Sequence, residues 1–341
     1  MKLISHKCII PSAAFTLKPS IIKFYCGIDK PPENGDLIYG EVSSMGQHRT
    51  LESKSARIHT IQEGTRAVFV LGNRYAPDYY ESFLPKTLGR TIDLTARSGL
   101  VGTVSIQNMK IAAPTIVDVL GYVCDGQGKV VNTRDHVQIK PKNKIKSLKR
   151  AKLILCVGTA MNSGKSHAAA TCCYALSSMN KKVRAAKVTG TASLKDLLLM
   201  EDCGAEPVAD FTYLGFPSTY MLSEEELLYI FNSIDLKYGN NRSNYLVVEF
   251  ADGILQRETA MLLRMEEVKT RIHKLIFCGN DAFGVIGGIR LLKDQFNLEA
   301  DAISGVCTSS PLHIRECRQF IDLPILKSAE IDHQAVYEII K

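Results

Sequence analysis

The sequence predicts an α/β protein with a mostly parallel sheet and helices on both faces, preceded by a small N-terminal β-barrel or β-sandwich domain. Short β runs separated by turn residues fill the first part of the chain, and no sustained helical pattern occurs before residue 150. After residue 150, apolar strand patterns alternate with helical ones, which is typical of parallel sheets. The length of 341 residues also suggests two domains, which we place at residues 1–147 and 148–341.

The first domain is predicted to consist of short β-strands. Its apolar runs are rich in β-branched residues and are bounded by turn residues; they span residues 37–42, 66–71, 100–106 and 117–123. The turn sequence Asp-Gly-Gln-Gly at residues 125–128 favours a hairpin into a further run at 129–131. We expect these strands to close into a small barrel or to pack as a sandwich.

One loop of the first domain carries a candidate binding residue. Arg74 lies in the loop at residues 72–76, directly after the run at 66–71. It is either an exposed arginine in a turn or a group that faces a nucleotide or substrate. The second interpretation follows from the guanidinium group, whose fixed fork of donors suits phosphate and carboxylate groups.

A basic segment separates the two domains. Residues 140–152 combine a proline with repeated lysines, which is typical of a linker and places the boundary near residue 148. The wider stretch 136–195 holds 13 Lys and Arg and no Asp or Glu, in a chain of net charge +7. It forms either a solvated basic surface or a field that attracts polyanions. Aromatic residues do not interleave with these lysines, which argues against stacking on nucleic-acid bases.

The second domain is predicted to alternate strands with helices. Expected strands span residues 153–157, 182–188, 245–248, 274–278, 302–307 and 323–326, with a short buried segment at 208–211. Expected helices span residues 167–179, 197–200, 223–234 and 283–292. Ser193 or a neighbour is placed to cap the second helix and Gly204 to end it, while Ser223 and Glu226 form a capping box for the third.

A glycine-rich loop joins the first of these strands to the first helix. Residues 158–166 read Gly-Thr-Ala-Met-Asn-Ser-Gly-Lys-Ser, a phosphate-binding pattern in which Thr159 stands where the first glycine is expected. Backbone N–H groups of such a loop, and the N-terminus of the following helix, face an anion. Lys165 is expected to neutralise the β- and γ-phosphates, and Ser166 to bind Mg²⁺. The expected nucleotide contacts are Gly158, Thr159, Asn162, Ser163, Gly164, Lys165, Ser166 and His167.

Two carboxylates are candidates for the same metal. Glu249 follows the buried run 245–248, and Asp252 comes three residues later. An acid at the end of a buried strand is costly unless it meets a cation or hydrogen-bond donors. We therefore expect Glu249 or Asp252 to bind Mg²⁺, with an N-cap or loop carboxylate as the alternative.

Further polar residues lie near the carboxyl ends of the expected strands, where open α/β sheets bind their ligands. Lys187 lies at the end of the run 182–188, next in sequence to the phosphate loop and its helix. The candidates for binding a small acceptor molecule are Thr189, Thr191, Ser193, Asp196 and Asp210, together with Arg74 from the first domain.

Composition indicates the compartment. The ten cysteines include no Cys-x-x-Cys pair and the histidines show no ligand spacing, so we expect reduced, mostly buried thiols and no structural zinc. No run of about 18 apolar residues occurs, and the N-terminus lacks the apolar stretch of a signal peptide. We therefore expect a cytoplasmic protein with no membrane partner.

Three segments resemble the dethiobiotin synthetase-like P-loop proteins, a class that also holds cobyrinic acid amide synthases and MinD-like ATPases. They are the phosphate loop, the segment Lys-Val-Thr-Gly that starts at Lys187, and the segment Val-Glu-Phe-Ala-Asp-Gly at residues 248–253. The resemblance covers residues 151–326 and implies ATP as the nucleotide. It implies that Lys187 contacts substrate and phosphate and that Glu249 binds Mg²⁺, so that Lys165, Lys187 and Glu249 are the catalytic residues. The chain is also similar to uncharacterised bacterial two-domain P-loop proteins.

Three functions are left open by the sequence. The leading one is an ATP- and Mg²⁺-dependent enzyme that transfers the γ-phosphoryl group to a carboxylate, carbamate or hydroxyl group of a small acceptor, as a kinase or ligase does. The second is a nucleotide-dependent switch or accessory protein whose β domain binds a partner. The third is a nucleic-acid 5′-kinase, which the lack of interleaved aromatic residues disfavours. A homodimer is compatible with each of them.

Overall fold

The chain forms two compact units in a computed structural model that describes residues 1–4, 8–27, 29–140, 150–327 and 332–341. Unit 1 consists of residues 1–138, 191–194 and 211–221, and unit 2 of residues 139–190, 195–210 and 222–341. The expected boundary near residue 148 lies outside the described residues. The division into residues 1–147 and 148–341 stays a prediction, and two short segments of the second half belong to unit 1.

Unit 1 is rich in β-strands, as the sequence predicts. The four long runs correspond to β3 (Leu37–Ser44), β6 (Arg66–Leu71), β10 (Leu100–Gln107) and β11 (Thr115–Cys124). The hairpin turn after β11 is confirmed by a hydrogen bond of 2.9 Å from Asp125 N–H to the Lys129 carbonyl. The shorter strands are β1 (Lys2–Leu3), β2 (Phe24–Cys26), β4 (Thr50–Glu52), β5 (Ile58–Thr60), β7 (Arg74–Tyr75), β8 (Tyr80–Phe83) and β9 (Thr91–Leu94).

The strands of unit 1 pair in a circuit that returns to its starting strand, β11–β3–β6–β10–β9–β11. Side chains along β3 and β6 alternate between two apolar clusters. Ile38 and Phe69 lie in one cluster, and Tyr39 and Val68 lie in the other. Both faces are therefore buried over residues 37–40 of β3 and 67–71 of β6, which explains why these stretches lack polar side chains.

Two cysteines of unit 1 form a disulfide bond. Cys26 of β2 is bonded to Cys124 of β11, and these strands are antiparallel neighbours. The prediction that the cysteines are reduced is wrong for this pair, because strand pairing joins positions that are 98 residues apart in the sequence. The other eight cysteines are free thiols, and six of them are buried.

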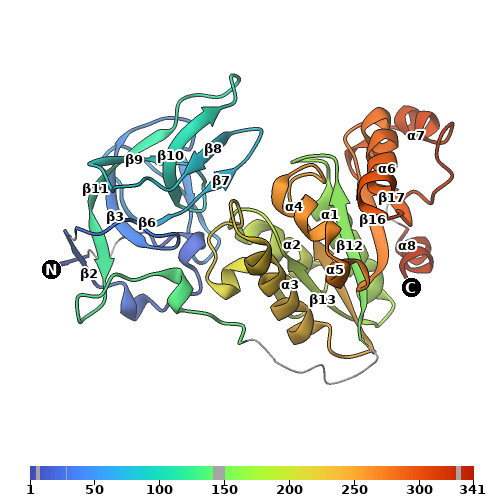
Figure 1. Cartoon of the computed structure of the whole chain (residues 1–341), viewed down its shortest axis with the longest axis horizontal. Helices are drawn as coiled ribbons and strands as arrows, with labels where there is room; N and C mark the ends of the chain where they lie inside the picture. Colours follow the sequence, from blue (N-terminus) through green and yellow to red (C-terminus); the bar gives the residue numbers. More distant parts are fainter. Residues whose placement is uncertain (5–7, 28, 141–149, 328–331) are drawn as a thin grey trace. The chain divides into compact units, whose positions relative to one another are not determined.

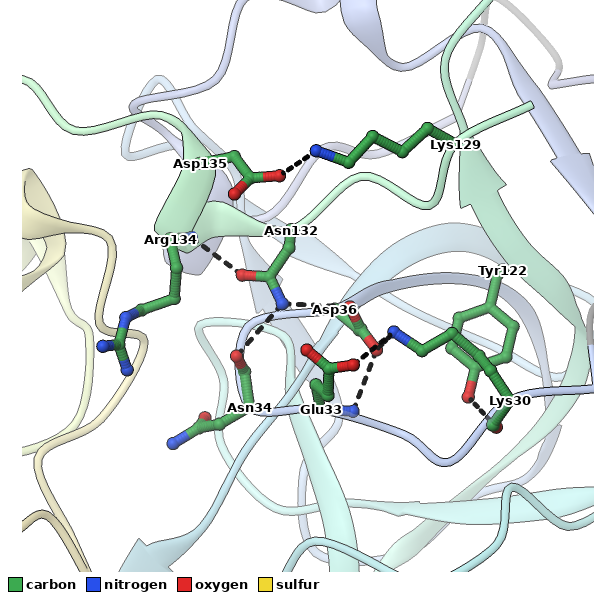
Figure 2. A network of polar contacts seen from close by, with 9 residues as sticks. All are labelled: Lys30, Glu33, Asn34, Asp36, Tyr122, Lys129, Asn132, Arg134 and Asp135. Carbon is green, nitrogen blue, oxygen red and sulfur yellow. Dashed lines mark hydrogen bonds and ion pairs between the residues drawn. The ribbon is translucent and has the colours of Figure 1, made fainter. Parts of the chain in front are cut away.

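A polar network joins the start of β3 to the segment after β11 (Figure 2). The buried carboxylate of Asp36 accepts from Asn132 Nδ2 at 2.9 Å and from the Glu33 N–H at 2.9 Å. It also forms an ion pair of 2.8 Å with Lys30. Asn132 Oδ1 accepts from the Arg134 N–H and so caps a short 3₁₀ turn (Thr133–Asp135). These donors offset the cost of burying the Asp36 charge.

Unit 2 is an α/β unit around a parallel sheet, as predicted (Figure 1). The strand order is β14–β13–β15–β12–β16–β17, and each of these pairs is parallel. The strands are β12 (Lys152–Gly158), β13 (Lys182–Lys187), β14 (Val208–Asp210), β15 (Asn244–Glu249), β16 (Ile272–Cys278) and β17 (Ala302–Ser304). The strand that precedes the phosphate loop therefore lies in the interior of the sheet.

The helices that accompany this sheet are α1 (Lys165–Ser178), α2 (Leu194–Asp202), α3 (Glu224–Tyr238), α4 (Arg257–Arg264), α5 (Glu266–Lys269), α6 (Ala282–Phe296), α7 (Pro311–Cys317) and α8 (His333–Ile340). The connection β12–α1–β13 runs toward one edge of the sheet, and β15–α4–β16 runs toward the other. Right-handed crossovers place α1 and α4 on opposite faces. In agreement, α8 packs on α1, and α4 packs on α3. Among the described residues, no helix has both the length and the apolar character to cross a lipid bilayer.

The expected helices of unit 2 are found with ends that differ by up to four residues, two expected strand runs differ from the structure, and α4, α5, α7 and α8 were not predicted. The capping box of Ser223 and Glu226 is confirmed at the start of α3. The strand expected at 302–307 ends at Ser304, because Gly305 turns the chain with φ of 95° and a 3₁₀ turn (Val306–Ser309) follows. The run at 323–326 forms only an isolated bridge, from Ile325 to Ile303.

Candidate nucleotide site

The glycine-rich loop connects β12 to the N-terminus of α1, as the sequence predicts. Asn162 and Gly164 have positive φ angles of 59° and 93°. A Cβ on Gly164 would lie 2.7 Å from the Cα of Gly305, and one on Gly158 would lie 2.5 Å from the Cys278 carbonyl oxygen. The two glycines are therefore required by backbone contacts on either side of the loop. Asn162 and His167 are exposed, and Thr159 is half-buried.

Lys165, the first residue of α1, folds back over the loop. Its Nζ donates to the Ala160 carbonyl at 2.7 Å and to Ser163 Oγ at 3.4 Å, and the residue is 5% exposed. Burial lowers the pKa of Lys165, although the carboxylates of Glu249 and Asp252 oppose this shift. An ammonium group held by one carbonyl oxygen and one hydroxyl of a phosphate-binding loop is placed to exchange those partners for phosphate oxygens.

Glu249 and Ser166 meet because β15 lies next to β12 in the sheet. Ser166 Oγ donates to Glu249 Oε1 at 3.1 Å. Glu249 is 2% exposed, and its Oε2 is buried with no hydrogen-bond partner within the described part of the chain. Burial raises the pKa of Glu249, and Lys187 opposes this shift. A buried carboxylate oxygen that lacks a donor is suited to a cation.

Lys187 and Asp196 complete the cluster. Lys187 ends β13, lies opposite Glu249 in the sheet register, and forms an ion pair with Asp196 in the first turn of α2. Its Nζ also lies 3.8 Å from Glu249 Oε1. Burial alone would lower the pKa of Lys187, but Asp196 and Glu249 outweigh it and raise that pKa. Burial alone would raise the pKa of Asp196, but the Lys187 ammonium lowers it, helped by the charge of Lys195.

Asp252 lies in the acidic loop, by which we mean residues 250–253 after β15. Its φ is 60°, and its carboxylate is close enough to act on the pKa of both Lys165 and Lys187. Gly253 packs against the phosphate loop so closely that a Cβ would lie 2.2 Å from the Thr159 carbonyl oxygen. The Ile254 N–H donates to the Gly158 carbonyl at 2.9 Å. The acidic loop therefore packs directly on the phosphate loop.

The other expected acceptor-binding residues have varied surroundings, and their role stays a prediction. Thr189 is buried, and its hydroxyl is bonded to the backbone of the acidic loop. Asp210 is buried at the end of β14, opposite Lys187 in the register. Thr191 belongs to unit 1, where it pairs with Ser218.

Arg74 is not the exposed turn arginine that one interpretation expected. It begins β7 in unit 1, is 6% exposed, and its Nη1 lies 3.2 Å from His48 Nε2. Its guanidinium also lies over the Tyr79 ring, 5.2 Å from the centroid. Burial and the Arg74 charge lower the pKa of His48 to about 4, so this histidine is neutral near pH 7.

Comparison with known proteins gives distant likenesses only. No protein-family model and no curated protein matches the chain. A solved structure of the signal recognition particle receptor FtsY from Elizabethkingia anophelis is 12% identical, with a TM-score of 0.39 over 60% of this chain and 67% of that one. A DUF1611 family protein from Anabaena variabilis is 14% identical, with a TM-score of 0.39 over 59% and 63%. A ParA family ATPase from Chlorobium tepidum is 14% identical, with a TM-score of 0.34 over 56% and 92%. At these values the likenesses carry no conclusion about activity.

Proposed function

We propose that this chain is a P-loop enzyme of the dethiobiotin synthetase-like type, which uses ATP and Mg²⁺ to transfer the γ-phosphoryl group to a small acceptor. The acceptor group would be a carboxylate, a carbamate or a hydroxyl. The observation that carries the proposal is the meeting of Lys165 and Ser166 with Glu249, Lys187 and Asp196, which come from two neighbouring strands and two helices.

The residues present fit a magnesium ion. No three His, Cys, Asp or Glu side chains group as a metal site in the described ranges, but Mg²⁺ in such enzymes takes one or two carboxylates and completes its shell with phosphate oxygens and water. Glu249 Oε2, Ser166 Oγ and Asp196 would hold the ion, and Asp252 is a further candidate. When bound, Mg²⁺ would draw charge from the transferred phosphoryl group.

The chain's own groups would supply positioning and charge. Backbone N–H groups of the loop and the N-terminus of α1 would hold the phosphates, and Lys165 would neutralise their charge. Lys187, on the strand next to β15, would hold an anionic acceptor near the phosphate loop. For the β-rich unit we propose a small barrel, supported by its circuit of strand pairs.

The test is a calorimetric titration of the wild-type chain with ATP in the presence and absence of Mg²⁺, followed by turnover assays with panels of small carboxylates, amines and alcohols. We expect Mg²⁺-dependent ATP binding, and phosphate transfer or release that needs an acceptor. Absence of nucleotide binding would overturn the proposal. The switch function would be favoured instead if ATP hydrolysis is slow, does not respond to any small acceptor, and changes its rate when a partner protein is added.

A further inference from the structure

Two buried threonine hydroxyls and the backbone N–H and carbonyl of one residue of unit 2 form a closed ring of hydrogen bonds, which we call the hydroxyl ring. The Ala251 N–H donates to Thr189 Oγ1 at 2.8 Å, and Thr259 Oγ1 donates to the Ala251 carbonyl at 2.8 Å. The two hydroxyl oxygens lie 3.4 Å apart. Because Thr259 uses its hydrogen on the carbonyl, Thr189 is the donor in the remaining bond.

The hydroxyl ring joins three elements that meet at the candidate nucleotide site. Thr189 comes two residues after Lys187, at the end of β13, and Thr259 lies in the first turn of α4. Ala251 lies in the acidic loop, between Glu249 and Asp252. Both threonines are 1% exposed, so water does not compete for these bonds.

The acidic loop needs such a constraint, because it holds an uncommon backbone conformation. Asp252 has φ of 60°, in the left-handed region that is unfavourable for residues other than glycine, although less so for aspartate than for most. On one side the loop packs on Thr159 through Gly253. On the other side the hydroxyl ring satisfies both polar groups of Ala251.

We propose that Thr189 and Thr259 are positioning residues, which fix the acidic loop so that Asp252 stays directed toward Lys165 and Lys187 during turnover. The expected effect on turnover rests on the proposed function. The expected effect of the hydroxyl ring on the conformation of the acidic loop does not depend on it. Thr189 would then act through the loop rather than by touching an acceptor.

The test uses variants that remove a hydroxyl and keep the side-chain shape. Thr259→Val leaves the Ala251 carbonyl without its donor, Thr189→Val leaves the N–H without its acceptor, and Thr259→Ser keeps the ring. The matched control is Thr115→Val in unit 1. Thr115 is also fully buried, and its hydroxyl also makes two bonds, to the His48 carbonyl at 2.7 Å and from the Gly46 N–H at 2.9 Å.

Three quantities are measured on each variant of the full chain: hydrogen exchange of residues 250–256, affinity for MgATP, and turnover. In both ring variants we expect exchange to speed up by about tenfold or more, and turnover to fall by about tenfold to hundredfold, as for one or two lost hydrogen bonds. MgATP affinity should stay within about threefold, because none of the expected nucleotide contacts lies in the acidic loop. Thr259→Ser should restore both quantities.

Several results would overturn the inference. One is a loss of turnover in Thr115→Val as large as in the ring variants. Another is unchanged hydrogen exchange of residues 250–256 in the ring variants. The others are wild-type turnover not being retained in Thr259→Ser, and a loss of MgATP affinity as large as the loss of turnover. If the wild-type chain does not bind MgATP, the proposed function fails, and the exchange data then decide alone whether the ring fixes the acidic loop.

Discussion

Removal of the Lys187 ammonium should destabilise the protein in a way that depends on pH. Lys187→Ala leaves Asp196 and Glu249 close together without their shared cation. Breaking a buried pair costs about 3–5 kcal/mol of unfolding free energy. The Lys187 and Asp196 side chains keep 12% and 19% exposure, so water screens the pair in part and we expect a smaller loss, about 2–3 kcal/mol near pH 7.

The sign of the pH dependence follows from the carboxylates. In the wild type, Lys187 holds the pKa of Asp196 below its ordinary value, so this group stabilises the fold above its unfolded pKa and loses that effect as the pH falls. Without Lys187, burial and the mutual repulsion of the two carboxylates should raise the pKa values of Asp196 and Glu249 above their unfolded values. The variant should then lose stability as the pH rises, and its deficit should be larger at pH 8 than at pH 5.

Urea unfolding at several pH values measures both effects. The matched control is Lys274→Ala, which removes an ion pair of 2.9 Å with Asp301 whose side chains are 27% and 32% exposed. This more exposed pair should cost about 1 kcal/mol or less at any of these pH values. Mg²⁺ alone should raise the melting temperature of Lys187→Ala more than that of the wild type, since a cation restores the lost charge. If Lys187→Ala costs no more than Lys274→Ala and shows no pH dependence, the role of Lys187 in this cluster is refuted.

Three further predictions concern the phosphate loop and its neighbours. Lys165→Ala should weaken MgATP binding by about tenfold or more in calorimetry without unfolding, while Lys293→Ala on the exposed face of α6 should not; equal affinities would contradict the role of Lys165. Glu249→Gln should raise the Mg²⁺ concentration needed for half-maximal turnover by about tenfold. If only Asp252→Asn shows this effect, Asp252 and not Glu249 is the Mg²⁺ ligand. Gly164→Ala places a Cβ 2.7 Å from a backbone carbon of the neighbouring loop, at φ of 93°, so nucleotide binding should be lost; unchanged binding would show that the loop can move aside.

The parts of the fold that the sequence predicted are those with local signals. The phosphate loop, the strand before it and the capping box of α3 each depend on residues within a few positions of one another. The strand predicted at 302–307 is longer than the observed one, because an apolar run in the sequence does not indicate the positive φ angle of Gly305. The burial of Arg74 was not predicted either. Arg74 lies in β7, which pairs with β8 through only two residues of β7, and so short a strand leaves no apolar run in the sequence.

The candidate site was predicted in part. Ser166 and Glu249 were both expected to bind Mg²⁺, from the phosphate-loop pattern and the family resemblance, and this role stays a prediction; the structure shows a hydrogen bond of 3.1 Å between their side chains. Asp196 was expected to bind the acceptor, and this role stays a prediction; the ion pair of its carboxylate with Lys187 was not predicted. Its position in the first turn of the helix after β13 was the available signal. The disulfide gave no signal, because nothing in the spacing of Cys26 and Cys124 shows that their strands are neighbours.

The path of the chain sets a limit on how this protein can be divided or rearranged. The chain changes unit after residues 138, 190, 194, 210 and 221, so no single cut separates the two units. The segments that return to unit 1 bury apolar side chains in it, among them Ala192 and Phe216, and the Arg134 guanidinium lies 3.9 Å from the Phe216 ring centroid. A fragment that starts after the basic segment would expose these side chains and tend to aggregate. Neither unit can therefore be exchanged as one continuous cassette, and genetic recombination within the chain would have to preserve several junctions at once.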